Sequence, residues 1–248
     1  TEIYTLSLHD ALPIFLLAFS VNWRQRNALR ALAEQVHLAL LVESAESLAF
    51  VDDLGCAVDV WLKVDVGAGR TGVVWDDVQV FEQLVRMPLR SAKLRGLLTH
   101  AGHTYGAGGA DVVRRVYAQS VERIGCLRQA LQSQTGCALE ISVGDTPGCS
   151  LSEDLGAVDE IRPGNFVFYD AEQAAFGSCP TEWVAVAVAC PVVALHPAQE
   201  KVVIYGGAVH LSKDFWMQDG QRCYGWVALV NEAGDRKSTR LNSSHRIR

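Results

Sequence analysis

The chain has 248 residues, of which 49% are hydrophobic and 20% are charged. This balance is typical of a folded globular protein and excludes disorder over most of the chain. The net charge of -6 offers no basic surface to a phosphate backbone, so nucleic acid is not an expected partner. At roughly 100 to 200 residues per domain, the length allows one large α/β domain or two smaller ones.

The two ends differ in character from the rest of the sequence. Residues 1–14 contain an apolar stretch too short to span a bilayer and lack the basic start and cleavage site of a secretion signal. Residues 235–248 are basic and serine-rich, which predicts a disordered tail. SLHDALPI and DRKSTRLNSSH resemble translations of adapter oligonucleotides used in short-read DNA sequencing. We therefore expect two foreign ends around an internal fragment of a longer protein; natural, frayed termini are the alternative.

From residue 15 to about residue 180, helical and strand-like periods alternate. Ser44 is the expected N-cap of a helix that runs to residues 51–54. Such an alternation predicts a parallel sheet with helices outside it. The other expected helices are 22–35, 76–86 and 110–134, and the expected strands are 37–42, 58–66, 94–99, 138–143, about 159–162 and 166–169.

From Trp183 onward the pattern of hydrophobic and polar residues changes. VAVAVACPVVAL, KVVIYGG and CYGWVALV are valine-rich segments separated by turns, with no helix-length periodic segment between them. This pattern predicts a second, antiparallel β region over residues 181–234. The fold class is thus α/β, with a β/α domain over 15–180 followed by the start of a β domain.

The cysteine pattern bears on the cellular compartment. The seven cysteines are odd in number, lie 10 or more residues apart and include no C-x-x-C pair. We expect them to be reduced and mostly buried, which favours a cytoplasmic location.

A glycine loop, Gly67 to Gly72, follows the strand expected at 58–66. Its G-x-G-x-x-G spacing matches the dinucleotide fingerprint, but three residues intervene before the acidic helix start, so a nucleotide site is the weaker interpretation. Arg70 lies inside this loop at the carboxyl end of a strand, where β/α barrels collect their active-site groups. It could either contact an anion or cofactor or form a salt bridge that pins the loop. Lys63, on the same strand, requires a carboxylate or a modification, and Asp65 is its expected partner.

The next strand ends in LTHAGHTY, which carries His100, His103 and Tyr105. Two histidines and a tyrosine among small residues indicate a polar cluster with room for a ligand. The H-x-x-H spacing could also bind metal, but no third ligand is near in sequence, so a ring-stacking or proton-handling histidine is favoured.

Two later loops have the composition of an anion site. SVGDTPGCS, residues 142–150, places a glycine, an aspartate and a hydroxyl directly after a strand, which suits a nest of backbone amides around a phosphate; an ordinary turn is the alternative. RPGN, residues 162–165, leaves the following strand in a similar way. Adjacent late loops of β/α barrels commonly build a phosphate site together.

Four motifs in one order resemble enzymes of the alanine racemase fold that use pyridoxal phosphate (PLP), most closely D-threonine aldolase and D-serine dehydratase. They are K-x-D-x-G-x-G-R-x-G at 63–72, L-T-H-A-G-H-x-Y at 98–105, S-V-G-D-T-P at 142–147 and R-P-G-N-F-V-F-Y-D at 162–170. The resemblance covers residues 15–234. It implies an incomplete (β/α)8 TIM-type barrel followed by part of an antiparallel β domain.

Carried over to this sequence, the resemblance implies a role for each matching residue. Arg70 would lie near the phenolic oxygen of PLP and His100 would pack against its ring, and these two are the expected catalytic residues. Arg162 would approach the ring nitrogen, an assignment borrowed from alanine racemase, and Tyr169 would line the pocket. The phosphate would be held by Gly144, Asp145, Thr146, Gly164 and Asn165.

Two functional parts of the family do not match this sequence. The lysine that binds PLP covalently lies on an early strand, upstream of the matching region, and none of Lys63, Lys93, Lys201 and Lys213 occupies its motif. The zinc or manganese ligands of the family lie beyond residue 234, so no metal-binding residue is assigned here. The fragment is therefore expected to be inactive.

The parent protein is expected to be a PLP-dependent lyase that cleaves a C–C bond or eliminates the β-hydroxyl of a small D-amino acid; a racemase remains open. Members of the family often form homodimers, and no membrane partner is expected. The alternatives are a non-catalytic PLP-binding barrel, against which the β region after residue 180 argues, and a nucleotide-binding oxidoreductase, which rests on the glycine loop alone.

Overall fold

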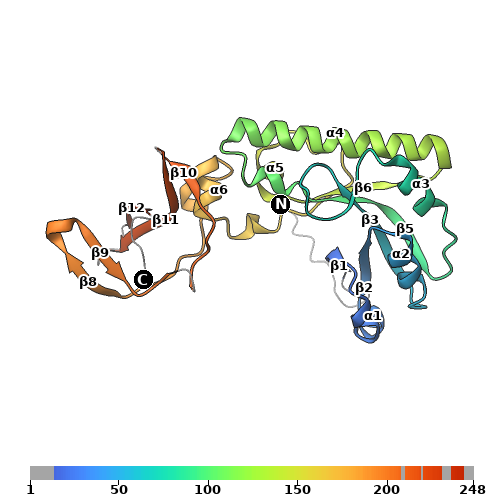
Figure 1. The fold of residues 1–248 in the computed structure, drawn as a ribbon, viewed down its shortest axis with the longest axis horizontal. Helices are drawn as coiled ribbons and strands as arrows, with labels where there is room; N and C mark the ends of the chain where they lie inside the picture. The colour runs from blue at the N-terminus through green and yellow to red at the C-terminus, as the bar shows by residue number, and fades with distance from the viewer. Residues whose placement is uncertain (1–13, 208–209, 219, 231–235, 243–248) are drawn as a thin grey trace, which may run out of the picture. The chain divides into compact units, whose positions relative to one another are not determined.

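The computed structural model describes residues 14–207, 210–218, 220–230 and 236–242, which divide into two compact units (Figure 1). Unit 1 holds the described residues up to His103, together with Arg115–Asp145 and Ser152–Arg162. Unit 2 holds Thr104–Arg114, Thr146–Leu151 and the described residues from Pro163 onward. Each unit is described separately below.

Unit 1 contains a seven-stranded parallel sheet, as the alternating pattern predicts. The strand order is β1-β2-β3-β5-β6-β7, with β4 paired to β3. No strand among the described residues joins β1 to β7, so the sheet is open. β1, which begins at Ile14, was not predicted from the sequence. The strands are β1 Ile14–Ser20, β2 His37–Val42, β3 Val58–Asp65, β4 Val73–Val74, β5 Ala92–Thr99, β6 Glu140–Val143 and β7 Glu160–Ile161.

Local signals in the sequence explain where the helices begin. The Ser44 side chain accepts a hydrogen bond from the Ser47 amide, and the Ser47 hydroxyl accepts one from the Ser44 amide, which completes a capping box at α2. The Asp77 side chain likewise caps α3. The helices around this sheet are α1 Arg26–Ala33, preceded by the 3-10 turn η1 Trp23–Gln25, α2 Ala45–Asp52, α3 Val78–Arg86 and α4 Ala110–Thr135, preceded by η2 Gly102–Thr104.

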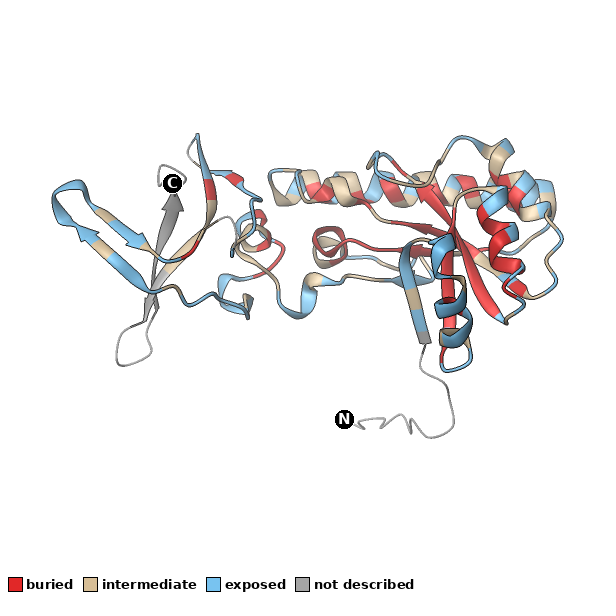
Figure 2. Ribbon diagram, turned by 60° about the horizontal axis from the view of Figure 1, so that its bottom comes forward, coloured by how far each residue is buried: buried red, intermediate tan, exposed pale blue. Residues whose placement is uncertain are grey.

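The core of unit 1 lies between the sheet and its helices (Figure 2). Every residue of β3 except Asp65 is buried, as expected for a central strand that is covered on both faces. The predicted apolar face of α4 is confirmed: Tyr117, Ile124, Leu127 and Leu131 are buried in unit 1 and Val116 is half-buried, while Val113, which is also buried, belongs to unit 2.

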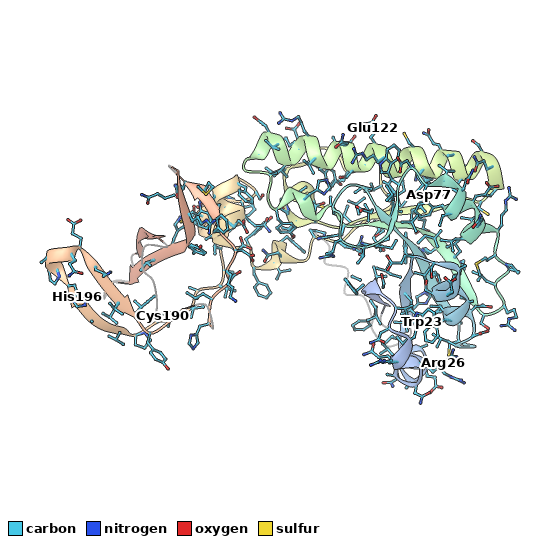
Figure 3. All side chains as sticks on the ribbon, in the orientation of Figure 1. Trp23, Arg26, Asp77, Glu122, Cys190 and His196 are labelled. Atoms are coloured by element: carbon cyan, nitrogen blue, oxygen red, sulfur yellow. The ribbon has the colours of Figure 1, made fainter. Side chains whose placement is uncertain are left out.

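An aromatic contact fixes the start of α1 against α2. The ring of Trp23 stacks on Phe50 with centroids 5.6 Å apart, and the Arg26 guanidinium lies 4.6 Å from the Phe50 centroid. Figure 3 shows Trp23 and Arg26 together on this segment. An Arg26 Nη1 hydrogen bond of 3.0 Å to the Asp53 carbonyl adds a polar tie.

Unit 2 combines short helices with antiparallel strands, which confirms the β texture predicted after Trp183. Its core groups Phe176, Trp216 and Cys223, with the Trp216 and Trp226 rings edge to face at 5.7 Å. β8 pairs with β9, and β10, β11 and β12 form a second sheet. The elements are α5 Thr146–Leu151, η3 Asn165–Val167, α6 Ala171–Phe176, η4 Thr181–Trp183, β8 Val192–His196, η5 Pro197–Gln199, β9 Lys201–Ile204, β10 Trp216–Gln218, β11 Gln221–Val230 and β12 Arg236–Asn242.

Two sequence predictions of secondary structure are wrong. The strand expected at 166–169 is instead a 3-10 turn, because the Asn165 carbonyl accepts the amides of Phe168 and Tyr169 at 3.0 and 2.7 Å. The expected disordered tail forms β12 over 236–242, paired antiparallel with β11. Backbone pairing at an open sheet edge requires no apolar periodicity, so composition did not reveal this strand.

The cysteine prediction is confirmed in part. All seven cysteines are free thiols, but Cys149, Cys179 and Cys223 are the buried ones, and Cys126 is exposed. The prediction that most of them are buried is therefore wrong. Within the described residues, no helix is both long enough and apolar enough to cross a membrane.

Candidate functional site

The carboxyl ends of the parallel strands gather the predicted site residues of unit 1. Register pairs Val64 of β3 with Thr99 of β5, Thr99 with Val143 of β6, and Val143 with Ile161 of β7. The residues that follow these strands therefore leave the sheet along one edge. They include Arg70 after β3, His100 after β5, Gly144 and Asp145 after β6, and Arg162 after β7.

Two carboxylates hold the glycine loop after β3. Asp65 accepts the amides of Gly67 at 2.8 Å and Gly69 at 3.1 Å, and Glu43 accepts the amide of Gly72 at 2.5 Å. β4 and a turn separate the loop from α3, which begins only at Val78. The loop therefore does not open a helix, which argues against the dinucleotide interpretation.

Arg70 is exposed and does not pin the loop by an ion pair within the described part of the chain. Its guanidinium lies 5.9 Å from the centroid of the Phe19 ring. The salt-bridge interpretation of Arg70 is therefore not supported by the geometry, because Asp65 and Glu43 fix the loop through its backbone. The side chain is left available for a ligand.

Lys63 differs from the expectation. Its side chain is 4% exposed, and among the described residues Nζ has no hydrogen-bond partner. The predicted partner, Asp65, turns to the glycine loop instead. Burial and the positive charges of Arg162 and Arg70 together lower the pKa of Lys63 to about 8, while Glu43 and Asp65 act in the opposite direction.

The surroundings of His100 favour its uncharged imidazole form. Burial lowers its pKa to about 4, and the charges of Arg70, Lys63 and Arg162 act in the same direction, against a hydrogen bond with the Gly144 backbone. An uncharged ring beside three cations is suited to packing on a flat ligand and to accepting a proton.

Arg162 is fixed by the ends of β5 and β6. Its Nη2 donates to the Thr99 carbonyl at 2.8 Å, and its Nε donates to the Ser142 hydroxyl at 2.7 Å. Glu160 forms an ion pair with Nε at 3.4 Å and a hydrogen bond with the Ser142 hydroxyl. The guanidinium is thus a cation held in one place at the sheet edge.

A second polar cluster lies in unit 2. The Thr146 amide donates to the Tyr105 hydroxyl at 3.2 Å, and the Thr146 hydroxyl accepts the Asn165 amide at 2.9 Å. The Ser150 and Tyr169 hydroxyls are 3.0 Å apart. Thr146 is fully buried and is the first residue of α5, so the predicted turn is in fact the start of a short helix.

Tyr169 has a φ of 48°, a left-handed conformation that is uncommon for a residue other than glycine. The Asn165 side chain donates to Asp170 at 2.5 Å, and Asp170 also caps α6, so the residues on either side of Tyr169 are held firmly. Such conformations tend to occur at functional sites. Gly164, the remaining residue of the predicted phosphate site, begins the η3 turn.

The sequence pattern of the alanine racemase N-terminal domain matches residues 5–172, more than half of the chain. The chain belongs to this family. The prediction drawn from the four motifs is confirmed at the level of family and fold.

Two curated relatives that are similar in sequence to this alanine racemase family chain are named as dehydratases. The D-threo-3-hydroxyaspartate dehydratase of Delftia sp. (strain HT23) is 30% identical over 185 residues, which cover 71% of this chain and 48% of the relative. The D-serine dehydratase of Dictyostelium discoideum is 28% identical over 165 residues, covering 62% of this chain and 41% of the relative. The chain spans about half the length of these relatives.

Solved structures confirm the fold of this family member. The Delftia dehydratase has a TM-score of 0.76 at 24% identity, covering 90% of this chain and 60% of that protein. The D-threonine aldolase from Filomicrobium marinum has a TM-score of 0.68 at 18% identity, covering 93% of this chain and 64% of that protein. The predicted alanine racemase fold is therefore correct.

The role of Glu43, which follows β2 and contacts the glycine loop, was not predicted from the sequence. Tyr105 and Lys63 were named as candidates, but not the contact of Tyr105 with the Thr146 amide or the lack of a hydrogen-bond partner for the Lys63 amine among the described residues. A carboxylate that directly follows a buried strand was a visible signal for Glu43. His103 also carries a buried Nδ1 without a partner, and no three His, Cys, Asp or Glu side chains in the described ranges are grouped to hold a metal.

Proposed function

We propose that this chain carries the PLP-binding part of a lyase that acts on small D-amino acids with a β-hydroxyl group, of the D-serine dehydratase or D-threonine aldolase type. The observation that carries the proposal is that the strand register brings His100, Arg70 and Arg162, which follow β5, β3 and β7, to one edge of the sheet. Its family and the names of its relatives support the same assignment.

The residues present fit an anionic, aromatic cofactor. Lys63 is a buried cation without a hydrogen-bond partner among the described residues, and a nearby negative group would offset its cost. In unit 2, the Thr146 hydroxyl accepts the Asn165 amide and keeps its own proton to donate to a phosphate, while the Thr146 amide donates to the Tyr105 hydroxyl. PLP combines a phosphate, a flat ring and an anionic phenolic oxygen, groups that suit the cations and the imidazole of the unit 1 cluster.

Each residue then has a defined task. When bound, PLP supplies an electron sink for the bond that breaks at the amino acid's α-carbon. Arg70 neutralises the phenolic oxygen and His100 packs against the ring as an uncharged imidazole. Arg162 presents a fixed cation toward the ring nitrogen, and Tyr169 lines the pocket. Gly144, Asp145, Thr146, Gly164 and Asn165 bind the phosphate.

We further propose that PLP binds this chain without a covalent bond and that the chain does not turn over. Lys63, Lys93, Lys201 and Lys213 all lie outside the family's lysine motif. A metal ion, zinc or manganese, would assist the β-hydroxyl only in the full-length parent. A homodimer and a cytoplasmic location are part of the same proposal.

A PLP titration tests this proposal. The chain should bind PLP, seen as a change in the cofactor's absorbance, and borohydride should fix no PLP to any lysine in peptide mass spectra. Arg70→Ala should weaken binding about tenfold, because a charge-assisted hydrogen bond is lost. Arg24→Ala, which removes an exposed arginine of η1, is the matched control and should leave binding unchanged.

Three outcomes would count against the proposal. No PLP uptake by the wild-type chain would contradict the cofactor assignment, and a borohydride-fixed lysine would contradict non-covalent binding. A full-length parent that binds PLP but converts neither D-serine nor D-threonine would favour the non-catalytic PLP-binding alternative.

A further inference from the structure

One side chain, that of Glu43, joins three segments at the carboxyl edge of the unit 1 sheet. Glu43 follows β2 directly, and its Oε1 accepts the Ser20 hydroxyl, at the end of β1, at 2.8 Å. Its Oε2 accepts the Gly72 amide, at the end of the glycine loop, at 2.5 Å. The Glu43 amide in turn donates to the Ser47 hydroxyl at 3.2 Å, so the α2 capping box holds the backbone of Glu43 in place.

Gly72 is the point at which the glycine loop meets Lys63. Its φ is 107°, and a Cβ atom there would stand 2.9 Å from the Asp65 amide nitrogen and 3.0 Å from the Lys63 Cγ. The chain at Gly72 therefore packs directly on the Lys63 side chain. Because Asp65 holds Gly67 and Gly69 at the other end, Arg70 lies on a short span between two anchored points.

Glu43 also balances charge at Lys63. The charged groups that act on Lys63 are Arg162 and Arg70, which disfavour the ammonium form, and Glu43 and Asp65, which favour it. Glu43 contributes the larger of the two favourable effects. Asp65 already accepts two loop amides, so Glu43 is the carboxylate that couples loop position to the charge of Lys63.

We propose that Glu43 is the positioning residue of the candidate site: through Gly72 it holds the glycine loop that carries Arg70 against Lys63, and its carboxylate offsets the positive charge gathered there. The functional meaning of this position rests on the proposed function, in which Arg70 meets the phenolic oxygen of PLP. The hold of Glu43 on the glycine loop does not depend on any cofactor, so it can be tested separately from the contact of Arg70 with PLP.

The first test measures the reactivity of Lys63 toward acetic anhydride as a function of pH, by peptide mass spectrometry, with Lys93 as internal reference. Glu43→Gln should lower the pH at which Lys63 is half reactive by about one unit, because a favourable negative charge is lost. Glu82→Gln, a carboxylate of α3 that pairs with Arg86, is the matched control and should leave the Lys63 midpoint unchanged.

Unfolding would move the Lys63 midpoint in the opposite direction, up toward that of Lys93, so a misfolded variant is recognised. Ser20→Ala, which removes one of the two partners of the Glu43 carboxylate, is the milder second variant and should shift the midpoint the same way by less. If neither variant lowers the midpoint of Lys63, the proposal that the Glu43 carboxylate offsets the positive charge at Lys63 is overturned.

The second test compares binding of PLP with that of 3-deoxypyridoxal phosphate, which lacks the phenolic oxygen. The wild-type chain should prefer PLP, and Glu43→Gln should reduce this preference several-fold while phosphate-dependent binding of both compounds persists. A preference that is unchanged in Glu43→Gln overturns the role of Glu43 in placing Arg70. If the wild-type chain binds neither compound, the proposed function fails, and the Lys63 reactivity alone decides on Glu43.

Discussion

The Arg162 guanidinium packs against the backbone of Gly144, where a Cβ atom would stand 2.8 Å from Nη1 and 3.1 Å from Cζ. A side chain at position 144 must therefore displace Arg162 from its hydrogen bonds with Thr99 and Ser142. We expect Gly144→Ala to lower the free energy of unfolding by about 1 to 3 kcal/mol, as overpacking does, measured by urea denaturation.

The matched control for this substitution is Gly125→Ala. Gly125 lies within α4, and no heavy atom stands within 4 Å of the position its Cβ would take. Alanine should raise the stability there slightly, by about 0.5 to 1 kcal/mol, because it favours the helix over the unfolded chain. Equal effects of the two substitutions would contradict the close packing of Arg162 on Gly144.

Lys63 is expected to reduce the stability of the fold that it serves. Burial, Arg162 and Arg70 lower its folded-state pKa from 10.5 to about 8, so below pH 8 folding must bury a charged amine. Between pH 8 and 10.5 the unfolded chain binds the proton more tightly, so the contribution of Lys63 makes stability rise with pH. Lys63→Met should remove this rise and increase the stability at pH 7 by about 2 kcal/mol, while weakening PLP binding.

Thermal and urea unfolding between pH 7 and 10 would test the Lys63 prediction. Lys93→Met replaces an exposed lysine of β5 and should leave the pH dependence of stability unchanged. A Lys63→Met variant that is less stable than the wild type at pH 7 would contradict the prediction, because it would show that the buried amine stabilises the folded chain.

Local and periodic features were predictable from the sequence. Ser44 and Ser47 form a capping box within four residues of one another, and the apolar face of α4 follows from 3.6-residue spacing. Because each parallel strand ends at the same edge, the motif positions of Arg70, His100 and Arg162 were also sufficient to place them on one side of the sheet.

Features that depend on a choice between partners were not predictable. Asp65 is on the same strand as Lys63, but the amides of Gly67 and Gly69 compete for its carboxylate and outnumber the single amine. Tyr169 lies in a segment that resembles a strand in sequence. In the structure its φ is positive and its amide donates to the Asn165 carbonyl. Such outcomes are decided by several distant groups together, which no single segment of sequence reveals.

Asp52 should confer acid sensitivity on unit 1. Burial alone would raise its pKa, but hydrogen bonds from the backbone of Ser91, Ala92 and Arg90 and from the Arg90 side chain outweigh this and lower it to about 2. The carboxylate therefore stabilises the fold above pH 4, and this contribution is lost as the pH falls toward 2. Asp52→Asn should cost about 2 kcal/mol at pH 7 and little at pH 2, measured by urea unfolding.

The adjacent Asp53 provides the control for Asp52. It pairs with the same arginine, through Arg90 Nη2 at 2.6 Å, but its side chain is 56% exposed. Solvent screens such a pair, so Asp53→Asn should cost less than about 1 kcal/mol at any pH. A similar cost for both substitutions would show that the buried amide contacts of Asp52 contribute little.

Glu172 of α6 should make the stability of unit 2 fall as the pH rises, whereas Asp52 makes the stability of unit 1 rise with pH. Burial raises its pKa to about 7, and the charges of Asp170 and Asp214 act in the same direction. A carboxyl group with a raised folded-state pKa contributes stability that is present below pH 4.5 and is lost as the pH rises through 7. Glu172→Gln should therefore have little effect at pH 4.5 and raise the stability at pH 8 by about 1 kcal/mol, a figure reduced because the side chain is partly exposed.

Thermal unfolding at both pH values measures the effect of Glu172→Gln. The control is Glu82→Gln, which breaks the exposed pair with Arg86 and should instead be slightly destabilising at pH 8. Equal stability of Glu172→Gln and wild type at pH 8 would mean that neither burial nor the charges of Asp170 and Asp214 disfavour the ionised Glu172 carboxylate in the folded chain.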